Sequence, residues 1–388
     1  MVSVGKYSGC DIEATLAQNG LDGDGQIWQR QFDKISSSEV ERVLASPPGY
    51  YNLKDLMVLV SPAAENYLEE MAKLARRLTI QRFGRTIRLY APLYLSNYCV
   101  NSCRYCGFNR DNKFERIRLT LEQALAEAEI IASEGFRDIL LVSSEDREFV
   151  SDSYLAELAE RLRDKFSFIA IEIYRMNQAE YARLFEAGIE GVTLYQETYS
   201  RGAYAHYHPA GPKSDYEDRL KAPDSIAAAG MREIGLGVLL GLADWRVETL
   251  ALAEHAHYLM RRYWQCHVSF SFPRLRPAYE VEASQFKHLL SDKNLAQMVM
   301  ALRLCFADAG LVLSTREPAQ LRDHLIKLGI TKISAGSKTN PGGYSRQGGS
   351  VEQFEVNDTR TPAQVAAMIR AQGAEAVWKD WDGAFIRD

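Results

Sequence analysis

Short apolar runs alternate with amphipathic stretches over most of the chain. Eight of the apolar runs predict strands, which are Pro92–Tyr98, Asp138–Val142, Phe168–Tyr174, Gly191–Tyr195, Glu233–Leu240, Val268–Phe272, Leu311–Leu313 and Lys332–Ser334. The stretches between them carry apolar residues at helical spacing, which predicts helices over Leu121–Ala132, Tyr154–Arg163, Gln178–Glu186, Val247–Tyr263 and Gln297–Phe306. Strands separated by helices of this length indicate βαβ units and a parallel sheet.

The number of predicted strands decides between two architectures. Eight strands, each followed by polar residues, are typical of an α/β fold of the (βα)8 TIM-type barrel class. An open sheet with six strands is the alternative. Glycine spacing supports the alternation, since Gly135, Gly188, Gly230 and Gly310 each stand just before a strand. We expect all four at the left-handed position that ends a helix.

The segments on either side of the barrel differ from it in pattern. Residues 1–88 predict an N-terminal helical extension, with an amphipathic run over Ala63–Thr79 that follows a proline. Residues 89–337 hold the barrel. Residues 338–388 contain one predicted helix, Pro362–Gln372, and a tryptophan-rich end. We expect this C-terminal α/β segment to close the barrel or to dock a partner.

Composition limits the kinds of partner and the cellular compartment that we expect for this protein. The chain has 388 residues, a formal net charge of −5, and no basic excess of the kind that nucleic-acid binding requires. It lacks a secretory signal and any run of about 20 apolar residues, so we expect no membrane span. Three of its six cysteines lie within eight positions, which is unlike a disulfide framework. We therefore expect a reduced, cytoplasmic protein.

The clustered cysteines are the strongest chemical signal. Cys99, Cys103 and Cys106 follow the first predicted strand with C-x3-C-x2-C spacing. Thiolates are soft ligands that suit zinc or an iron–sulfur cluster. Zinc would need a fourth ligand, and the nearest histidine, His206, is about a hundred residues away. A four-iron cluster with three protein ligands keeps one iron open for a cofactor or substrate. The alternatives are a zinc knuckle or three cysteines that only pack.

This motif, with aromatic Tyr105 before the third cysteine, resembles the signature of the radical S-adenosylmethionine superfamily. Further blocks are similar to its aromatic amino-acid lyases, and most closely to the tyrosine lyases of bacterial thiamine thiazole synthesis. The blocks are LYLSNYCVNSCRYCGFNR (93–110), LYQETY (194–199), IGLGVLLGLADWR (234–246), SFSFPRLRP (269–277), LSTRE (313–317), SAGSKTNPGGYS (334–345) and VWKDWD (377–382). The resemblance implies a [4Fe–4S] cluster and S-adenosylmethionine as cofactors.

The resemblance also implies which residues bind the cofactor. Ser143 and Glu145 match the place where the superfamily holds the methionyl ammonium, although Ser144 stands where the family usually has glycine. Glu197 resembles an acid that contacts the cofactor, and Arg219 resembles the arginine that pairs with its carboxylate. These roles suit the chemistry, because a carboxylate pairs with ammonium and a guanidinium offers a fork to carboxylate.

A second set of residues is implied for the substrate. Arg316 in LSTRE is similar to the arginine that anchors the substrate carboxylate, and Ser314 and Ser334 are placed to assist it. Arg274 and Arg276 follow the sixth predicted strand and are candidates to line the same cavity. Alternation places these two arginines on the same side if their segment is extended.

The implied reaction is radical cleavage of the Cα–Cβ bond of L-tyrosine. The 5′-deoxyadenosyl radical removes hydrogen from the amino group, and the products are 2-iminoacetate and p-cresol, with methionine and 5′-deoxyadenosine from the cofactor. The family implies a reductase or flavodoxin-type electron donor and a complex with thiazole synthase, which receives 2-iminoacetate. No nucleic acid or membrane partner is expected.

Other activities compete with this interpretation. The hydrogenase-maturation tyrosine lyases resemble the barrel but carry three further cysteines near the C-terminus, whereas no cysteine follows Cys305 here. A tryptophan lyase differs only in a pocket that sequence does not define. A non-catalytic iron–sulfur protein would commonly need four thiolates, and a radical enzyme acting on RNA would be expected to carry a basic domain.

Overall fold

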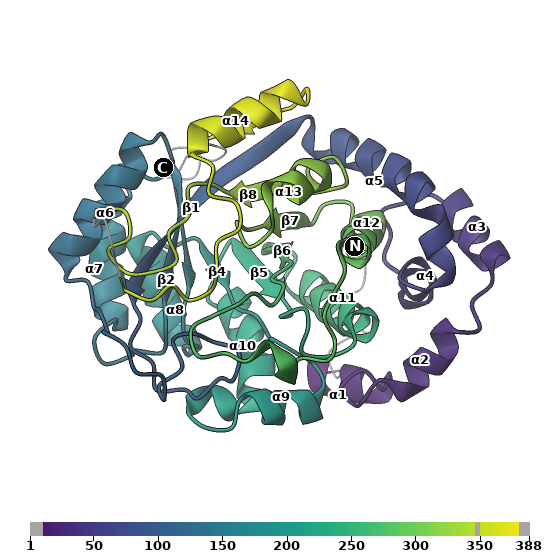
Figure 1. The fold of residues 1–388 in the computed structure, drawn as a ribbon, viewed down its shortest axis with the longest axis horizontal. Helices are drawn as coiled ribbons and strands as arrows, with labels where there is room; N and C mark the ends of the chain where they lie inside the picture. Colours follow the sequence, from purple (N-terminus) through teal and green to yellow (C-terminus); the bar gives the residue numbers. More distant parts are fainter. Residues whose placement is uncertain (1–10, 346–349, 380–388) are drawn as a thin grey trace, which may run out of the picture.

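The computed structural model describes residues 11–345 and 350–379 of the chain. Eight parallel strands form a closed barrel at its centre (Figure 1). They are β1 (Thr86–Ser96), β2 (Asp138–Ser143), β3 (Phe168–Glu172), β4 (Gly191–Thr193), β5 (Glu233–Gly237), β6 (His267–Ser271), β7 (Gly310–Leu313) and β8 (Lys332–Ser334). Pairing of β1 with both β8 and β2 closes the circle. The (βα)8 barrel is confirmed, and the open six-stranded sheet is wrong.

Helices link successive strands and cover the outside of the barrel. They are α6 (Leu121–Ser133), α7 (Asp152–Leu162), α8 (Gln178–Ala187), α10 (Tyr216–Ala228), α11 (Trp245–Arg262), α12 (Asp292–Cys305) and α13 (Ala319–Leu325). Short helical turns in the loops are α9 (Arg201–Tyr207), η2 (Pro212–Ser214) and η3 (Ala283–Gln285). The five helices predicted between the strands are confirmed, with shifted ends. Helix α12 begins before its predicted start at Gln297, because the Ser291 hydroxyl caps it by accepting a hydrogen bond from the Asn294 amide.

Strand β1 differs from its prediction at both ends. It starts at Thr86 rather than Pro92, and it ends at Ser96 rather than Tyr98. Its first residues pair with β8 and with a ninth strand, β9 (Glu375–Val377), which the sequence did not reveal. The chain therefore leaves the barrel wall at Ser96, and the cysteine motif lies wholly in the loop that follows.

Three of the four glycine predictions hold. Gly135, Gly188 and Gly230 have φ values of 103°, 111° and 92°, in the left-handed region at helix ends. The prediction for Gly310 is wrong, because Gly310 is the first residue of β7. A Cβ there would come within 2.9 Å of the Ser269 Cβ on β6. Gly310 thus allows two neighbouring strands to approach.

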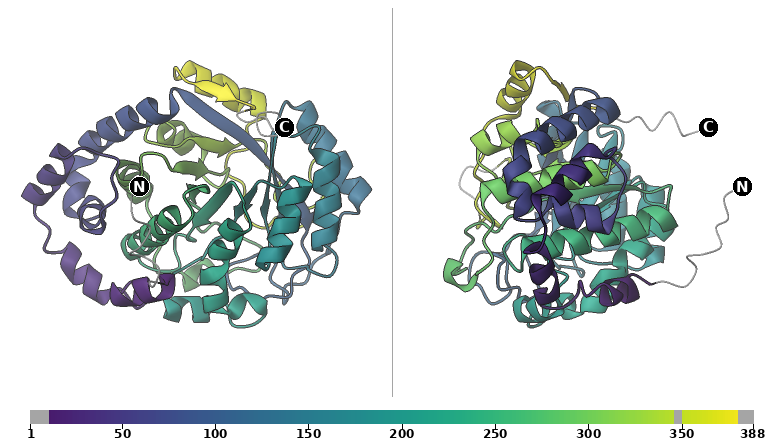
Figure 2. Two further views of the ribbon diagram at one scale, coloured as in Figure 1. Left: turned by 180° about the vertical axis from the view of Figure 1, so that it is seen from behind. Right: turned by 90° about the vertical axis from the view of Figure 1, so that its right-hand side faces the viewer.

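The N-terminal segment forms an arc of helices along one side of the barrel (Figures 1 and 2). These helices are α1 (Ile12–Gln18), α2 (Gln26–Phe32), α3 (Ser37–Ala45), α4 (Leu53–Leu59), the turn η1 (Ala63–Tyr67) and α5 (Leu68–Phe83). Helix α5 packs on α12, and α4 packs on both α11 and α12. Their apolar faces join the main core of the barrel. None of the described helices is both long and apolar enough to cross a membrane.

The segment after β8 crosses the carboxyl ends of the strands before it forms α14 (Pro362–Ala371) and β9 (Figure 1). The Tyr344 hydroxyl donates to the Pro92 carbonyl at 2.8 Å, and the Asn357 amide donates to the Thr315 carbonyl at 3.0 Å. These contacts tie the segment to β1 and to the loop after β7, two elements that flank β8. We call residues 339–345 and 350–358 the covering segment.

Candidate active site

The cysteine loop after β1 is held by the segment between α9 and η2. The Ser102 amide donates to the Ala210 carbonyl at 3.0 Å, and the Arg104 amide donates to the Tyr207 carbonyl at 3.1 Å. Gly211 completes this junction with φ 99° and ψ 173°, a conformation that only glycine adopts readily. The position of the cysteines therefore depends on a segment about a hundred residues further along the chain.

Cys99, Cys103 and Cys106 line one cavity at the barrel mouth. Burial, together with the neighbouring thiols, raises the pKa of the Cys103 thiol to about 12 and that of Cys106 to about 11. Among the described residues, no group of three or more Cys, His, Asp or Glu side chains forms a site for a single metal ion. In a four-iron cluster each thiolate binds a different iron, so its ligands spread further apart than those of one ion. Three thiols without a fourth ligand fit such a cluster.

Two amides contact the sulfurs. Asn101 donates to Cys99 Sγ from its backbone at 3.5 Å and from its side chain at 3.8 Å. Gln353 of the covering segment approaches Cys106 Sγ at 4.0 Å through its Nε2. Hydrogen bonds to cluster sulfurs influence the reduction potential of iron–sulfur clusters. Sequence analysis did not identify either residue.

The cofactor candidates Glu197 and Arg219 meet in the same cavity, together with a lysine that sequence analysis missed. Lys213 Nζ donates to Glu197 Oε1 at 2.6 Å, and Arg219 Nη2 lies 3.9 Å from the same oxygen. Burial alone would raise the pKa of the Glu197 carboxyl, but the charges of Lys213 and Arg219 outweigh burial and lower it. Glu197 is therefore ionised at neutral pH.

The backbone of Glu197 is unusual, with φ at 70° in a residue other than glycine. Glu248 on α11 stabilises the turn that follows. Its carboxylate accepts hydrogen bonds from the Thr198 hydroxyl at 2.8 Å and from the Tyr199 amide at 2.9 Å. A strained conformation of this kind persists where the surroundings hold it in place. The network directs the Glu197 side chain into the cavity.

Ser143, Ser144 and Glu145 line the cavity next to the cysteines. Glu145 accepts a hydrogen bond from the Asn101 side chain at 2.7 Å. Ser143 donates to the Ser144 carbonyl at 2.9 Å, and the Ser144 hydroxyl donates to the Ser96 carbonyl at 3.0 Å. Serine in place of the family's glycine thus connects the ends of β1 and β2.

Tyr105 is anchored by a histidine rather than by the cysteines. Its hydroxyl lies 2.8 Å from His208 Nε2, while His208 Nδ1 lies 2.8 Å from the Tyr204 carbonyl. A carbonyl only accepts, so Nδ1 carries the proton and Nε2 accepts from Tyr105. Burial and the Lys213 charge lower the pKa of His208 to about 3, so the ring is neutral.

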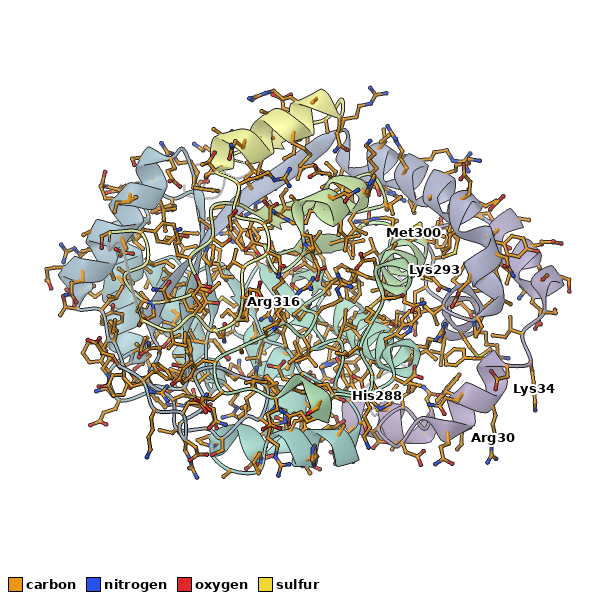
Figure 3. All side chains as sticks on the ribbon, in the orientation of Figure 1. Arg30, Lys34, His288, Lys293, Met300 and Arg316 are labelled. Carbon is orange, nitrogen blue, oxygen red and sulfur yellow. The ribbon has the colours of Figure 1, made fainter. Side chains whose placement is uncertain are left out.

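Arg316 lies where the cysteine cavity meets the interior of the barrel. Figure 3 labels it near the centre of the molecule, over the barrel. The cavity beside the cysteines and a deeper cavity within the barrel share part of their lining, Arg316 included, so they lie against each other. Ser314 and Ser334 line the deeper part. Ser314 Oγ accepts from the Arg316 amide at 3.4 Å, and the Arg316 guanidinium carbon lies 3.3 Å from the ring centre of Phe354.

The two arginines after β6 have different positions. Arg274 is buried, binds Glu317 through two nitrogens, and lies 2.7 Å from Asp292. It does not line the described cavity, which corrects the expectation for this residue. Arg276 does line the cavity, and its Nη2 donates to Glu317 at 2.6 Å. The sequence did not indicate that the buried Glu317 carboxylate accepts hydrogen bonds from both Arg274 and Arg276.

Glu172 is the second charged residue that sequence analysis missed. It ends β3 and lines both parts of the cavity. Burial raises the pKa of its carboxyl to about 7, against the lowering effects of the Arg316 charge and a hydrogen bond with Tyr195. The predicted strand Phe168–Tyr174 ran past Glu172 and so concealed its place at a strand end.

Comparison with known proteins agrees with this geometry. Residues 93–253 match the Radical SAM superfamily, and residues 271–375 match the Biotin and Thiamin Synthesis associated domain. The chain is 43% identical over 348 residues to a 2-iminoacetate synthase from Escherichia coli strain K12, covering 89% of this chain and 91% of that protein. The chain belongs to the 2-iminoacetate synthase family. A 2-iminoacetate synthase from Salmonella typhimurium is 44% identical over the same shares of the two chains.

Solved structures share the fold of this family member. A crystal structure of HydG, a maturase of the [FeFe]-hydrogenase, aligns with a TM-score of 0.87 at 34% identity, over 93% of this chain and 81% of that one. The HydG of Carboxydothermus hydrogenoformans aligns with a TM-score of 0.81 at 31% identity, over 95% and 83%. Methylornithine synthase, at 20% identity and a TM-score of 0.70, shares the fold.

Proposed function

We propose that this protein cleaves the Cα–Cβ bond of L-tyrosine to 2-iminoacetate and p-cresol, and so supplies the thiazole part of thiamine. The observation that carries the proposal is that the cavity lined by the three cysteines and a deeper cavity share Arg316 in their lining. The match to the Biotin and Thiamin Synthesis associated domain, over residues 271–375, supports the same pathway.

Cys99, Cys103 and Cys106 would bind three irons of a [4Fe–4S] cluster and leave the fourth open. Such a cluster, when reduced, would supply the single electron needed for reductive cleavage of S-adenosylmethionine. The protein contributes the placement of the ligands and the environment of their sulfurs. Asn101 and Gln353, which approach two of the three sulfurs, would influence the ease of reduction.

The acidic and basic groups beside the cysteines fit the methionyl end of S-adenosylmethionine. Glu197, Glu145 and Ser143 offer acceptors for its ammonium, and Arg219 offers donors for its carboxylate. Lys213 keeps Glu197 ionised, as pairing with an ammonium requires. Tyr105 lines the same space, and its hydrogen bond with His208 fixes its position.

We assign the substrate amino acid to the deeper cavity. We assign the substrate carboxylate to Arg316, assisted by Ser314 and Ser334, with Arg276 at the junction with the cofactor space. A guanidinium binds a carboxylate through two parallel hydrogen bonds, which fixes the orientation of the amino acid as well as its position. Aromatic and apolar side chains surround the remaining space, and they include Tyr90, Pro92, Tyr94, Phe272 and Phe354.

The covering segment shields this cavity from water. Phe354 contributes to the lining of both parts, and the Gln353 side chain accepts a hydrogen bond from the Tyr94 hydroxyl at 2.7 Å. An enclosed cavity limits the C–H bonds that a carbon radical can reach, and exclusion of water protects 2-iminoacetate from hydrolysis. This arrangement supports closure of the barrel as a role for the C-terminal segment.

The proposal also includes an electron donor, a protein that receives the product, and a cytoplasmic location. We assign the electron to a reductase or flavodoxin-type donor, and the product to thiazole synthase in a complex. The described cysteines are all free thiols, as cluster ligands must be before they bind iron, and free thiols persist in the reducing cytoplasm.

The test is a product assay on the reconstituted protein. The protein would be loaded anaerobically with iron and sulfide, and then given S-adenosylmethionine, a strong reductant and L-tyrosine. We expect 5′-deoxyadenosine, p-cresol, and glyoxylate from hydrolysed 2-iminoacetate, without cyanide. Deoxyadenosine formed with tryptophan but without p-cresol from tyrosine would contradict the assigned substrate, and cyanide would indicate the maturase reaction.

A further inference from the structure

Glu172 borders both the cofactor space and the substrate space. It lines the part beside the cysteines, the deeper part beside Ser314, and a smaller cavity further down the barrel. Arg316 lines the first two of these parts as well. An amino acid whose carboxylate is on Arg316 would therefore have its amino group within the region that Glu172 borders.

The other acidic groups of the cavity already have partners. Glu197 is paired with Lys213, and Glu145 accepts a hydrogen bond from Asn101. Glu172 makes a hydrogen bond with Tyr195, and no ion pair involves it in the described part of the chain. Its carboxylate is thus available to a positively charged ligand group.

The surroundings of Glu172 are mixed in charge. The titratable groups that face it from neighbouring elements are Tyr90 and Tyr94 on β1, Tyr195 and Glu197 after β4, Lys213 before α10, and Arg316 after β7. Its pKa is raised to about 7, mainly by burial and also by the charge of Glu197. Arg316, Tyr195 and Lys213 lower it. A carboxyl with this pKa both donates and accepts a proton near neutral pH.

We propose that the Glu172 carboxylate binds the ammonium group of the substrate amino acid and takes one proton from it. The transfer converts carboxylate and ammonium into carboxylic acid and neutral amine, with no change in electron count. This inference rests on the proposed function, in which an amino N–H bond is broken. A hydrogen atom leaves a neutral amine more readily than an ammonium, which would be left as a positively charged nitrogen radical.

The first test compares ligands that differ in one group, bound to the cluster-loaded, unreduced protein with S-adenosylmethionine present. The ligands are L-tyrosine, L-phenylalanine and 3-(4-hydroxyphenyl)propanoate, which lacks the amino group. Glu172→Gln should weaken both amino acids about 10- to 100-fold, the range of a lost charge-assisted hydrogen bond. It should leave the affinity for 3-(4-hydroxyphenyl)propanoate unchanged. Glu190→Gln, at the opposite end of the barrel, is the matched control and should change none of the three affinities.

The second test follows the proton. Binding of the ammonium favours ionised Glu172, so tyrosine affinity should rise as the pH rises through about 7 and then level off. Below that pH, calorimetry in buffers of different ionisation enthalpy should detect release of most of one proton per tyrosine bound. Glu172→Gln should abolish both the release and the pH dependence. Circular dichroism of the variant would confirm that it folds.

Two results would overturn the inference. Equal losses for tyrosine and 3-(4-hydroxyphenyl)propanoate, with phenylalanine unaffected, would place Glu172 at the phenol instead. Unchanged affinities for all three ligands would remove Glu172 from substrate binding. If the wild-type protein cleaved tryptophan but not tyrosine, the proposed substrate would fail separately. The comparison would then be made with tryptophan and 3-(indol-3-yl)propanoate.

Discussion

Gly211 offers a direct test of how the cysteine loop is positioned. Its φ of 99° and ψ of 173° are strained for any side-chain-bearing residue, and a Cβ there would lie 2.8 Å from both Asn101 Cα and the Val100 carbonyl oxygen. Contacts below 3.0 Å with backbone atoms cannot be relieved by rotating a side chain. Gly211→Ala must therefore displace either the cysteine loop or the segment that holds it.

The expected loss of stability in Gly211→Ala is the sum of two contributions. The backbone conformation costs about 1–3 kcal/mol for alanine, and the overpacked contact adds about 1–3 kcal/mol. Gly84 separates the two contributions, because its φ of 69° and ψ of −155° are similarly strained. No atom of the described residues beyond its chain neighbours lies within 4 Å of a Cβ built there. Gly84→Ala should show the first cost alone.

The assay measures unfolding stability together with iron, acid-labile sulfide and S-adenosylmethionine affinity after anaerobic reconstitution. Both variants should lose stability, but only Gly211→Ala should lose cluster and cofactor binding. Each 1.4 kcal/mol of strain borne by the loop corresponds to about a tenfold loss in affinity. Wild-type cluster content and cofactor affinity in Gly211→Ala, with a stability loss equal to that of Gly84→Ala, would refute the reasoning.

Three further substitutions test single assignments. Cys103→Ala should abolish the visible absorption of the reconstituted cluster, and a retained brown four-iron species would contradict its role as a ligand. Arg316→Ala should weaken tyrosine binding by about 10- to 100-fold and leave cofactor binding intact, as separate titrations would show. Lys213→Met removes the charge that opposes burial, so the pKa of Glu197 should rise. In the variant, Glu197 should then become protonated as the pH decreases toward its raised pKa, and the affinity for the cofactor should fall. The cofactor affinity of the wild-type protein should not change over the same pH range.

The barrel could be predicted because its strands are buried apolar runs separated by amphipathic helices, a pattern that local sequence carries. The limits of β1 could not, because Arg88 interrupts the apolar pattern and forms an ion pair with Asp138 inside the fold. The three residues of β9 carry no periodicity of their own. Their conformation depends on pairing with Thr86–Arg88, almost three hundred residues earlier in the chain.

Some residues of the candidate active site could likewise be predicted from the sequence, and others could not. The cysteine spacing lies within one loop, so sequence alone located it. Lys213 and Glu172 depend on how a loop folds back and on where a strand ends, which are tertiary facts. Arg274 is a residue to which the sequence assigned too much. Its position after β6 suggested a ligand-binding role, but in the structure it binds Glu317.

The covering segment also has a consequence for biosynthesis. Gln353, which reaches Cys106 Sγ, is 247 residues further along the chain. At about 5–20 residues per second of synthesis, roughly 10 to 50 s pass between the appearance of the two. The thiols thus leave the ribosome well before the residues that will cover them, and during that interval iron and sulfide can reach them from solution.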